Sequence, residues 1–138
     1  TQPTLAGAAT TAPNANGWYR GDVTVHWTAG DATSGVDGTT APADSVVTGE
    51  GSDLAAGPVS VSDLAGNSRS ATLSGLKVDR TKPSIAGAAT TEPNAAGWYR
   101  DDVTVGWTCD DALSGIATVV ASGHAPVAMP DKASSQVQ

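Results

Sequence analysis

The side chains most often used in catalysis are few in this chain, and their spacing does not favour it. The two histidines are His26 and His124, and neither has an Asp or Ser at a spacing that predicts a catalytic pair. Adjacent carboxylates occur at 101–102 and 110–111, where neighbours face opposite sides of a strand or line a turn. The sequence has no phosphate-binding glycine loop, zinc-protease motif or cysteine cluster, so we do not expect an enzyme.

A group of oxygen donors in turns could instead bind a metal ion. Asp31 opens the stretch DATSG, and Asp63 and Asn67 bracket the stretch DLAGN. If both turns lie at one end of a sandwich, Asp31, Asp37, Asp63 and Asn67 converge as the oxygen ligands that Ca²⁺ prefers. The alternative is that these side chains accept hydrogen bonds from turn amides. Their spacing matches no known calcium loop, so we expect turn capping and no cofactor, with Ca²⁺ as the competing hypothesis.

Paired aromatic residues could present ring faces to a carbohydrate. They are Trp18 with Tyr19, and Trp98 with Tyr99. The competing interpretation is that Trp18 covers one end of the fold or packs against the linker, because tryptophan is usually largely buried. We favour packing, and two coplanar rings open to solvent would favour sugar binding.

Composition limits the core and excludes some ligands. Apolar residues make up 39% of the 138 residues, with four Trp and no Phe, so any core is thin and suits a small two-layer fold. The net charge of −7 argues against nucleic acid, because the chain cannot neutralise a run of phosphates. No apolar run is long enough to predict membrane insertion.

These candidate residues belong to an internal repeat. Residues 4–36 and 84–116 share 23 identities in 33 positions, including the stretches PNANGWYRGDVTVHWT and PNAAGWYRDDVTVGWT. A period of 80 residues corresponds to one small domain per repeat. In this alignment Cys109 corresponds to Ala29, and His26 corresponds to Gly106. Because each of these two side chains occurs in only one copy, a required role for Cys109 or His26 is not expected.

Alternating hydrophobicity predicts that each repeat is built from β-strands. The stretch DVTVHWT places Val23, Val25 and Trp27 on one face. The stretch GPVSVSD points Val59 and Val61 inward, and SRSATLSGLKVD changes phase at Gly75, which predicts a β-bulge that brings Leu76 and Val78 to the core. Weaker strands are expected at TLAGA, GVDGTT and SVVTG, with a tight hairpin at DLAGN.

The pattern PNxxGWYRxDVTVxWT, then DATSGV, DLAGNS and KVDRTKPSI, resembles the tandem immunoglobulin-like repeats of exported bacterial proteins. The resemblance covers residues 1–80 and 81–116, and it implies an all-β, antiparallel immunoglobulin-like β-sandwich in tandem copies. We therefore expect a complete module over 1–80 and a second module over 81–138 that is truncated or divergent after 116. The second copy has only 22 residues after Ile116, against 44 after Val36 in the first, so we expect its opposite sheet to be incomplete.

The resemblance also implies a function. Such modules serve as spacers, stalks and accessory domains, so we expect a non-catalytic, secreted or cell-surface spacer that positions other domains and adheres weakly. Its expected partners are neighbouring domains of the same polypeptide, with polysaccharide as a candidate ligand. The alternative is an accessory carbohydrate-binding module of a secreted polysaccharide-degrading enzyme.

Overall fold

The computed structural model describes residues 1–118 and 136–137, and these residues form strands, turns and bends without any helix. The chain divides into two compact units, Thr1–Arg80 and Thr81–Gln138, and the sequence repeat restarts at the same point. Within the described residues, no helix is long and apolar enough to cross a membrane.

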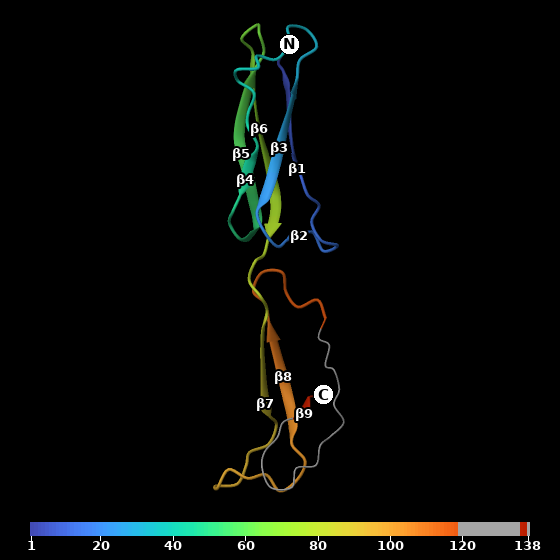
Figure 1. Ribbon diagram of the computed structural model, residues 1–138, viewed down its shortest axis with the longest axis vertical. Helices are drawn as coiled ribbons and strands as arrows, with labels where there is room; N and C mark the ends of the chain where they lie inside the picture. Colours follow the sequence, from blue (N-terminus) through green and yellow to red (C-terminus); the bar gives the residue numbers. More distant parts are fainter. Residues whose placement is uncertain (119–135, 138) are drawn as a thin grey trace. The chain divides into compact units, whose positions relative to one another are not determined.

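The first sheet of unit 1 has the order β1-β3-β4 (Figure 1). Strand β3 (Val23–Gly30) lies in the centre, with β1 (Thr4–Ala9) and β4 (Ser45–Val47) antiparallel on either side. The alternation of β3 explains its position, because Val23, Val25 and Trp27 on one face of the strand are buried.

The second sheet has the order β2-β6-β5. Strands β5 (Gly51–Ser62) and β6 (Ser68–Val78) form an antiparallel pair joined by the turn over residues 63–67, as predicted. The register shifts between the pairs Leu54–Leu76 and Ala56–Leu73, so β6 carries one extra residue there. This irregularity is the predicted bulge, and Gly75 within it has a φ of 77°.

The pairing corrects two expectations from the sequence. Strand β2 (Trp18–Tyr19) pairs with β6 in parallel, so the architecture is mixed and not purely antiparallel. The strand expected over residues 35–40 is not formed, and only Val36 makes an isolated bridge, to Asp63.

One core lies between the two sheets of unit 1, an arrangement compatible with a β-sandwich. Its buried side chains come from both sheets: Leu5, Val23, Val25, Trp27, Val47, Ala56, Val61, Leu76 and Val78. Val59 was also expected in the core but is only partly buried at its margin, because it follows the irregular stretch of the β5–β6 register.

Trp27 is held from two sides. Its indole Nε1 donates a hydrogen bond to the Ser45 hydroxyl at 2.9 Å, and its ring lies flat on Gly7, the residue paired with it across the sheet. A Cβ at Gly7 would lie 2.6 Å from the ring, so only glycine leaves room for this indole. In unit 2, the Trp107 ring lies against Gly87, its cross-strand partner, in the same way.

The described part of unit 2 is a single sheet with the order β7-β8-β9. Strand β7 (Ser84–Ala89) pairs with β8 (Thr104–Asp110) in the same register as β1 with β3. Strand β9 (Gln136–Val137) pairs in parallel with β8 at the residues equivalent to those where antiparallel β4 joins β3. Ala117 and Thr118, the last described residues before position 136, are not in a strand.

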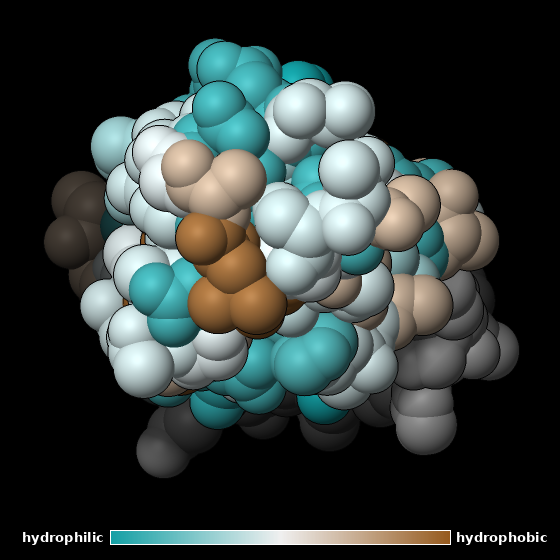
Figure 2. Space-filling view, turned by 90° about the horizontal axis from the view of Figure 1, so that it is seen from above, coloured by the Kyte–Doolittle hydropathy of each residue, from teal (hydrophilic) through white to brown (hydrophobic). Residues whose placement is uncertain are grey.

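The polypeptide enters unit 1 at one end and leaves it at the other (Figure 1). The Asn67 side-chain amide donates to the Thr1 carbonyl, which ties the N-terminus to the β5–β6 turn. At the opposite end, Arg80 pairs with Asp22 just before β3, and its backbone N–H donates to Glu50. Figure 2 views the N-terminal end and shows a largely hydrophilic or neutral surface around one small hydrophobic spot.

Candidate functional site

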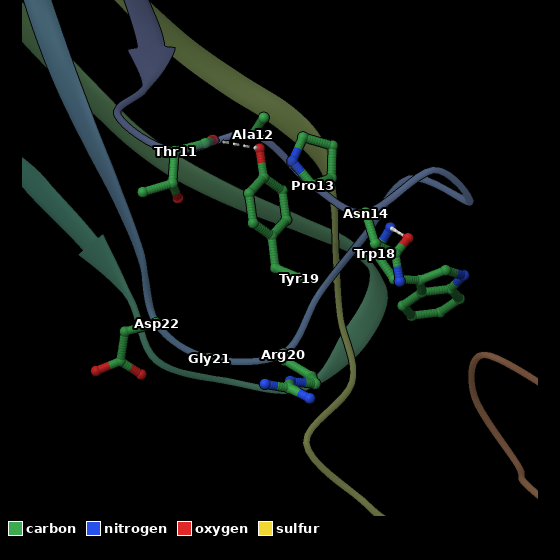
Figure 3. Close-up of a pocket in the computed structure, with 9 residues that line it drawn as sticks. All are labelled: Thr11, Ala12, Pro13, Asn14, Trp18, Tyr19, Arg20, Gly21 and Asp22. Atoms are coloured by element: carbon green, nitrogen blue, oxygen red, sulfur yellow. Dashed lines mark hydrogen bonds between the residues drawn. The ribbon is translucent and has the colours of Figure 1, made fainter.

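A surface depression occurs at the same place in each unit. In unit 1 it has a volume of about 490 Å³ and is lined by Thr11, Ala12, Pro13, Asn14, Trp18, Tyr19, Arg20, Gly21 and Asp22 (Figure 3). In unit 2 the equivalent nine residues line a depression of about 510 Å³. The repeated PNxxGWYRxD stretch therefore forms the same surface twice.

An asparagine sets the shape of this loop. The Asn14 side-chain oxygen accepts hydrogen bonds from the backbone N–H groups of Asn16 and Trp18, at 2.9 and 3.0 Å. Its own backbone N–H donates to the Trp18 carbonyl, and Gly17 turns the chain back with a φ of 83°. Asn94 makes the equivalent bonds in unit 2, so the tryptophan that follows is positioned in the same way.

Tyr19 is a structural residue of this loop. Its ring packs against the core, and its hydroxyl donates to the Thr11 carbonyl at 3.2 Å. Its backbone carbonyl accepts a hydrogen bond from Asp79 N–H at the end of β6. Tyr19 therefore holds the loop on the fold, and its side chain is half-buried in the lining of the depression.

Trp18 points away from Tyr19 (Figure 3). The indole is half-buried, and the Lys77 amine lies 5.9 Å from its ring centroid, within the range of a cation–π contact. In unit 2, Trp98 is 39% exposed and Tyr99 is half-buried. Each unit thus has one partly exposed indole at the depression, and in unit 1 the two rings point apart and do not form one platform (Figure 3).

The charge of the depression differs between the units. In unit 1 the charged residues that line the depression are one cation, Arg20, and one carboxylate, Asp22. Asp22 also forms an ion pair with Arg80. In unit 2, Glu92 replaces Ala12 and Asp101 replaces Gly21, so three carboxylates face the single Arg100. The second depression therefore favours cations over anions.

The four candidate metal ligands lie near one end of unit 1, and the three aspartates among them accept hydrogen bonds within their own turns. One Asp31 oxygen accepts from the backbone N–H groups of residues 33–35 and from the Ser34 hydroxyl. Asp37 accepts from the Thr39 hydroxyl and N–H, and Asp63 accepts from the Asn67 amide and N–H. Among the described residues, no group of three or more His, Cys, Asp or Glu could hold a metal ion.

These hydrogen bonds also stabilise the ionised form of the three aspartates relative to the protonated form. The Ser34 N–H lowers the pKa of Asp31, and the Thr39 hydroxyl lowers the pKa of Asp37. The Asn67 side chain lowers the pKa of Asp63, against the opposing effects of burial and of the nearby Asp31 charge. The Asp31 turn recurs at Asp111, whereas Asp37 is replaced by Ala117.

Sequence reasoning missed one titratable pair. The His26 Nδ1 lies 2.7 Å from an Asp44 oxygen, although the two residues are 18 positions apart in the chain. Their side chains are 64% and 48% exposed, and exposed pairs of this kind stabilise a fold by at most about 1 kcal/mol. The pair lies outside the depression, and His124 lies outside the described residues.

Comparisons of the chain with protein-family models, curated proteins and solved structures found no match.

Proposed function

We propose that this chain is a non-catalytic, immunoglobulin-like spacer segment of an exported bacterial protein, secreted or held at the cell surface, which positions neighbouring domains. The observation that carries the proposal is the path of the polypeptide through unit 1, in at one end and out at the other. A module connected in this way adds its own length to a tandem array. The adjacent repeat in the sequence supports the same use.

The strand order supports the immunoglobulin-like assignment. If β1, β3, β4, β5 and β6 are the A, B, E, F and G strands, the sheets read A-B-E and G-F, as in immunoglobulin-like sandwiches. The bridge between Val36 and Asp63 then lies where a C strand would pair with F. Unit 2 keeps the A and B strands of this scheme.

Solution scattering on arrays of one, two and three copies of residues 1–80 tests the spacer proposal. The eleven residues of β6 span about 35 Å at roughly 3.3 Å per residue, so each copy should lengthen the particle by a similar, constant amount. An array that collapses, with no regular increase in maximum dimension, would refute the spacer role.

The second candidate is carbohydrate binding through the repeated depressions. It is favoured by a partly exposed indole beside hydrogen-bonding side chains in each unit. Soluble β-glucans and chitin oligosaccharides should then quench tryptophan fluorescence in the wild-type chain. A Trp18→Ala, Trp98→Ala double variant should lose this binding, and Leu64→Ala, which alters an exposed turn outside both depressions, should keep it.

A further inference from the structure

The chain has four asparagines, and three of them use their side chains to hold a turn. The side-chain oxygens of Asn14 and Asn94 accept backbone N–H groups of their own loops. The Asn67 amide donates to the Asp63 carboxylate. The fourth, Asn16, is exposed, and its side chain makes no hydrogen bond to any residue that the structure describes. Its carboxamide is therefore the one that no turn holds in place.

The residue that follows Asn16 leaves this carboxamide accessible to the backbone. Gly17 has a φ of 83°, and a Cβ placed on it would meet no atom within 4 Å. No side chain therefore stands between the Gly17 nitrogen and the Asn16 carboxamide. The Gly17 N–H donates to the Asn14 carbonyl at 2.9 Å, but this bond closes an exposed turn, and such turns open in local fluctuations.

We propose that Asn16 is a site of spontaneous deamidation. The Gly17 backbone nitrogen attacks the carboxamide carbon of Asn16, loses its proton and displaces ammonia, so that a cyclic succinimide forms. Water then opens this ring at one of its two carbonyls. Opening at the side-chain carbonyl gives aspartate, whereas opening at the main-chain carbonyl gives isoaspartate, whose backbone runs through the former side chain. The reaction consumes water and releases ammonia, and it needs no enzyme, metal or oxidant.

The second repeat lacks this site although it keeps the loop. Ala96 stands at the position of Asn16, and Gly97 follows it with a φ of 86°. The hydrogen bonds within the two loops are otherwise equivalent. Deamidation at this loop should therefore change unit 1 alone, which makes the loop of unit 2 an internal reference.

Isoaspartate at position 16 would alter how Trp18 is held. The Trp18 N–H donates to the Asn14 side-chain oxygen, and the Trp18 carbonyl accepts from the Asn14 N–H, so both bonds span position 16. The longer backbone changes the span that these bonds close, and a carboxylate replaces the neutral amide. The loop that lines the depression of unit 1 should therefore loosen as the protein ages.

The test is incubation of the full chain at mildly alkaline pH, followed by peptide mass spectrometry. We expect Asn16 to convert at least tenfold faster than the other three asparagines, with isoaspartate detected by an isoaspartyl methyltransferase. Asn16→Ala is the matched control, because it copies the loop of unit 2 and should abolish the fast conversion without lowering the melting temperature. Ala96→Asn moves the Asn-Gly pair into unit 2, so residue 96 should then convert as fast as Asn16.

Amide hydrogen exchange measures the effect on the loop. In the isoaspartate form, separated by ion exchange through its added charge, the Trp18 N–H should exchange at least tenfold faster than in the unmodified chain. The equivalent Trp98 N–H should keep its rate. Asn16→Asp carries the same charge on an ordinary backbone and should retain slow exchange at Trp18, which separates the effect of the backbone from that of the charge.

Three results would overturn the inference. One is an Asn16 that converts no faster than the other asparagines, because the turn would then protect it. Another is an Ala96→Asn chain in which residue 96 stays intact, because the two loops have the same hydrogen bonds. The third is an isoaspartate form whose Trp18 amide exchanges at the unmodified rate. None of these changes the scattering expected from arrays of residues 1–80, so the spacer proposal is tested separately.

Discussion

At the scale of single residues, the two core tryptophans form a natural comparison. Trp27 and Trp107 occupy the same position on paired strands and lie on equivalent glycines, yet Trp27 is 5% exposed and Trp107 is 39% exposed. In unit 1, side chains of β5 and β6 pack in the same core as Trp27. Because a buried indole removes on the order of 200 Å² from water, burial of Trp27 dominates a core without phenylalanine.

Replacing these tryptophans should therefore give unequal losses of stability. Trp27→Ala should lower the free energy of unfolding by about 3–5 kcal/mol, enough to unfold so small a domain. Trp107→Ala and Trp18→Ala should each cost less than half as much, because their rings keep more contact with solvent. Urea unfolding followed by circular dichroism measures the order, and a larger loss for Trp18→Ala would show that the inward face is wrongly assigned.

The ionised side chain of Asp63 should make unit 1 sensitive to acid. Its pKa is lowered in the folded state, so its stabilising effect is complete above the ordinary aspartate pKa of about 4 and is lost as pH falls through the lowered value. Asp63→Asn should reduce the melting temperature at pH 7 and flatten its fall between pH 5 and pH 2. Asp101→Asn, at an exposed position of unit 2, is the control and should keep the wild-type pH profile. An unchanged profile for Asp63→Asn would contradict this assignment.

At the scale of elements, sequence patterns predicted most strands of unit 1, including the short β4, and missed β2 and the first half of β5. Alternation located β3, and the phase change at Gly75 located the bulge, because both are local properties of one strand. Strand β2 was missed because two residues carry no periodicity, and its parallel partner β6 lies about 60 positions later. The first half of β5 was missed because Gly51, Ala55 and Gly57 interrupt its alternation.

The same reasoning located part of the candidate site. A single repeated stretch supplies the loop of each depression, so the sequence alone brought Trp18 and Tyr19 to attention. It could not tell that the Tyr19 hydroxyl is tied to Thr11, because that contact depends on how the loop folds back. The His26–Asp44 pair was missed for a similar reason, since β4 brings Asp44 beside β3 from 18 positions away.

The acidic turns of unit 1 make a clear prediction about metal. Asp31, Asp37 and Asp63 already accept hydrogen bonds within their own turns. Adding EDTA should therefore leave the melting temperature unchanged. A rise of several degrees with millimolar calcium would contradict turn capping, because a ligand that binds only the folded state raises its stability. Asp31→Asn, Asp37→Asn and Asp63→Asn variants would then identify the ligands.

At the scale of the whole molecule, the two units should differ in stability. Unit 1 places a core between two sheets, whereas the described part of unit 2 is one sheet. At concentrations low enough to keep the chain monomeric, amides of residues 23–27 should exchange with solvent at least tenfold more slowly than those of 103–107. Residues 1–80 alone should unfold cooperatively, and 81–138 alone should not. Equally slow exchange in the two segments would contradict this prediction.

The parallel pairing of β2 with β6 has a consequence for mechanical load. A pulling force applied at Thr1 and Arg80 runs along the strands, because the chain enters and leaves unit 1 at opposite ends. The hydrogen bonds that join Trp18 and Tyr19 to the end of β6 then lie across the direction of pull. They are strained together in shear and must break together, whereas bonds at the open end of a hairpin break one after another. The shortest strand of the unit thus holds the last strand in place when the chain is under tension.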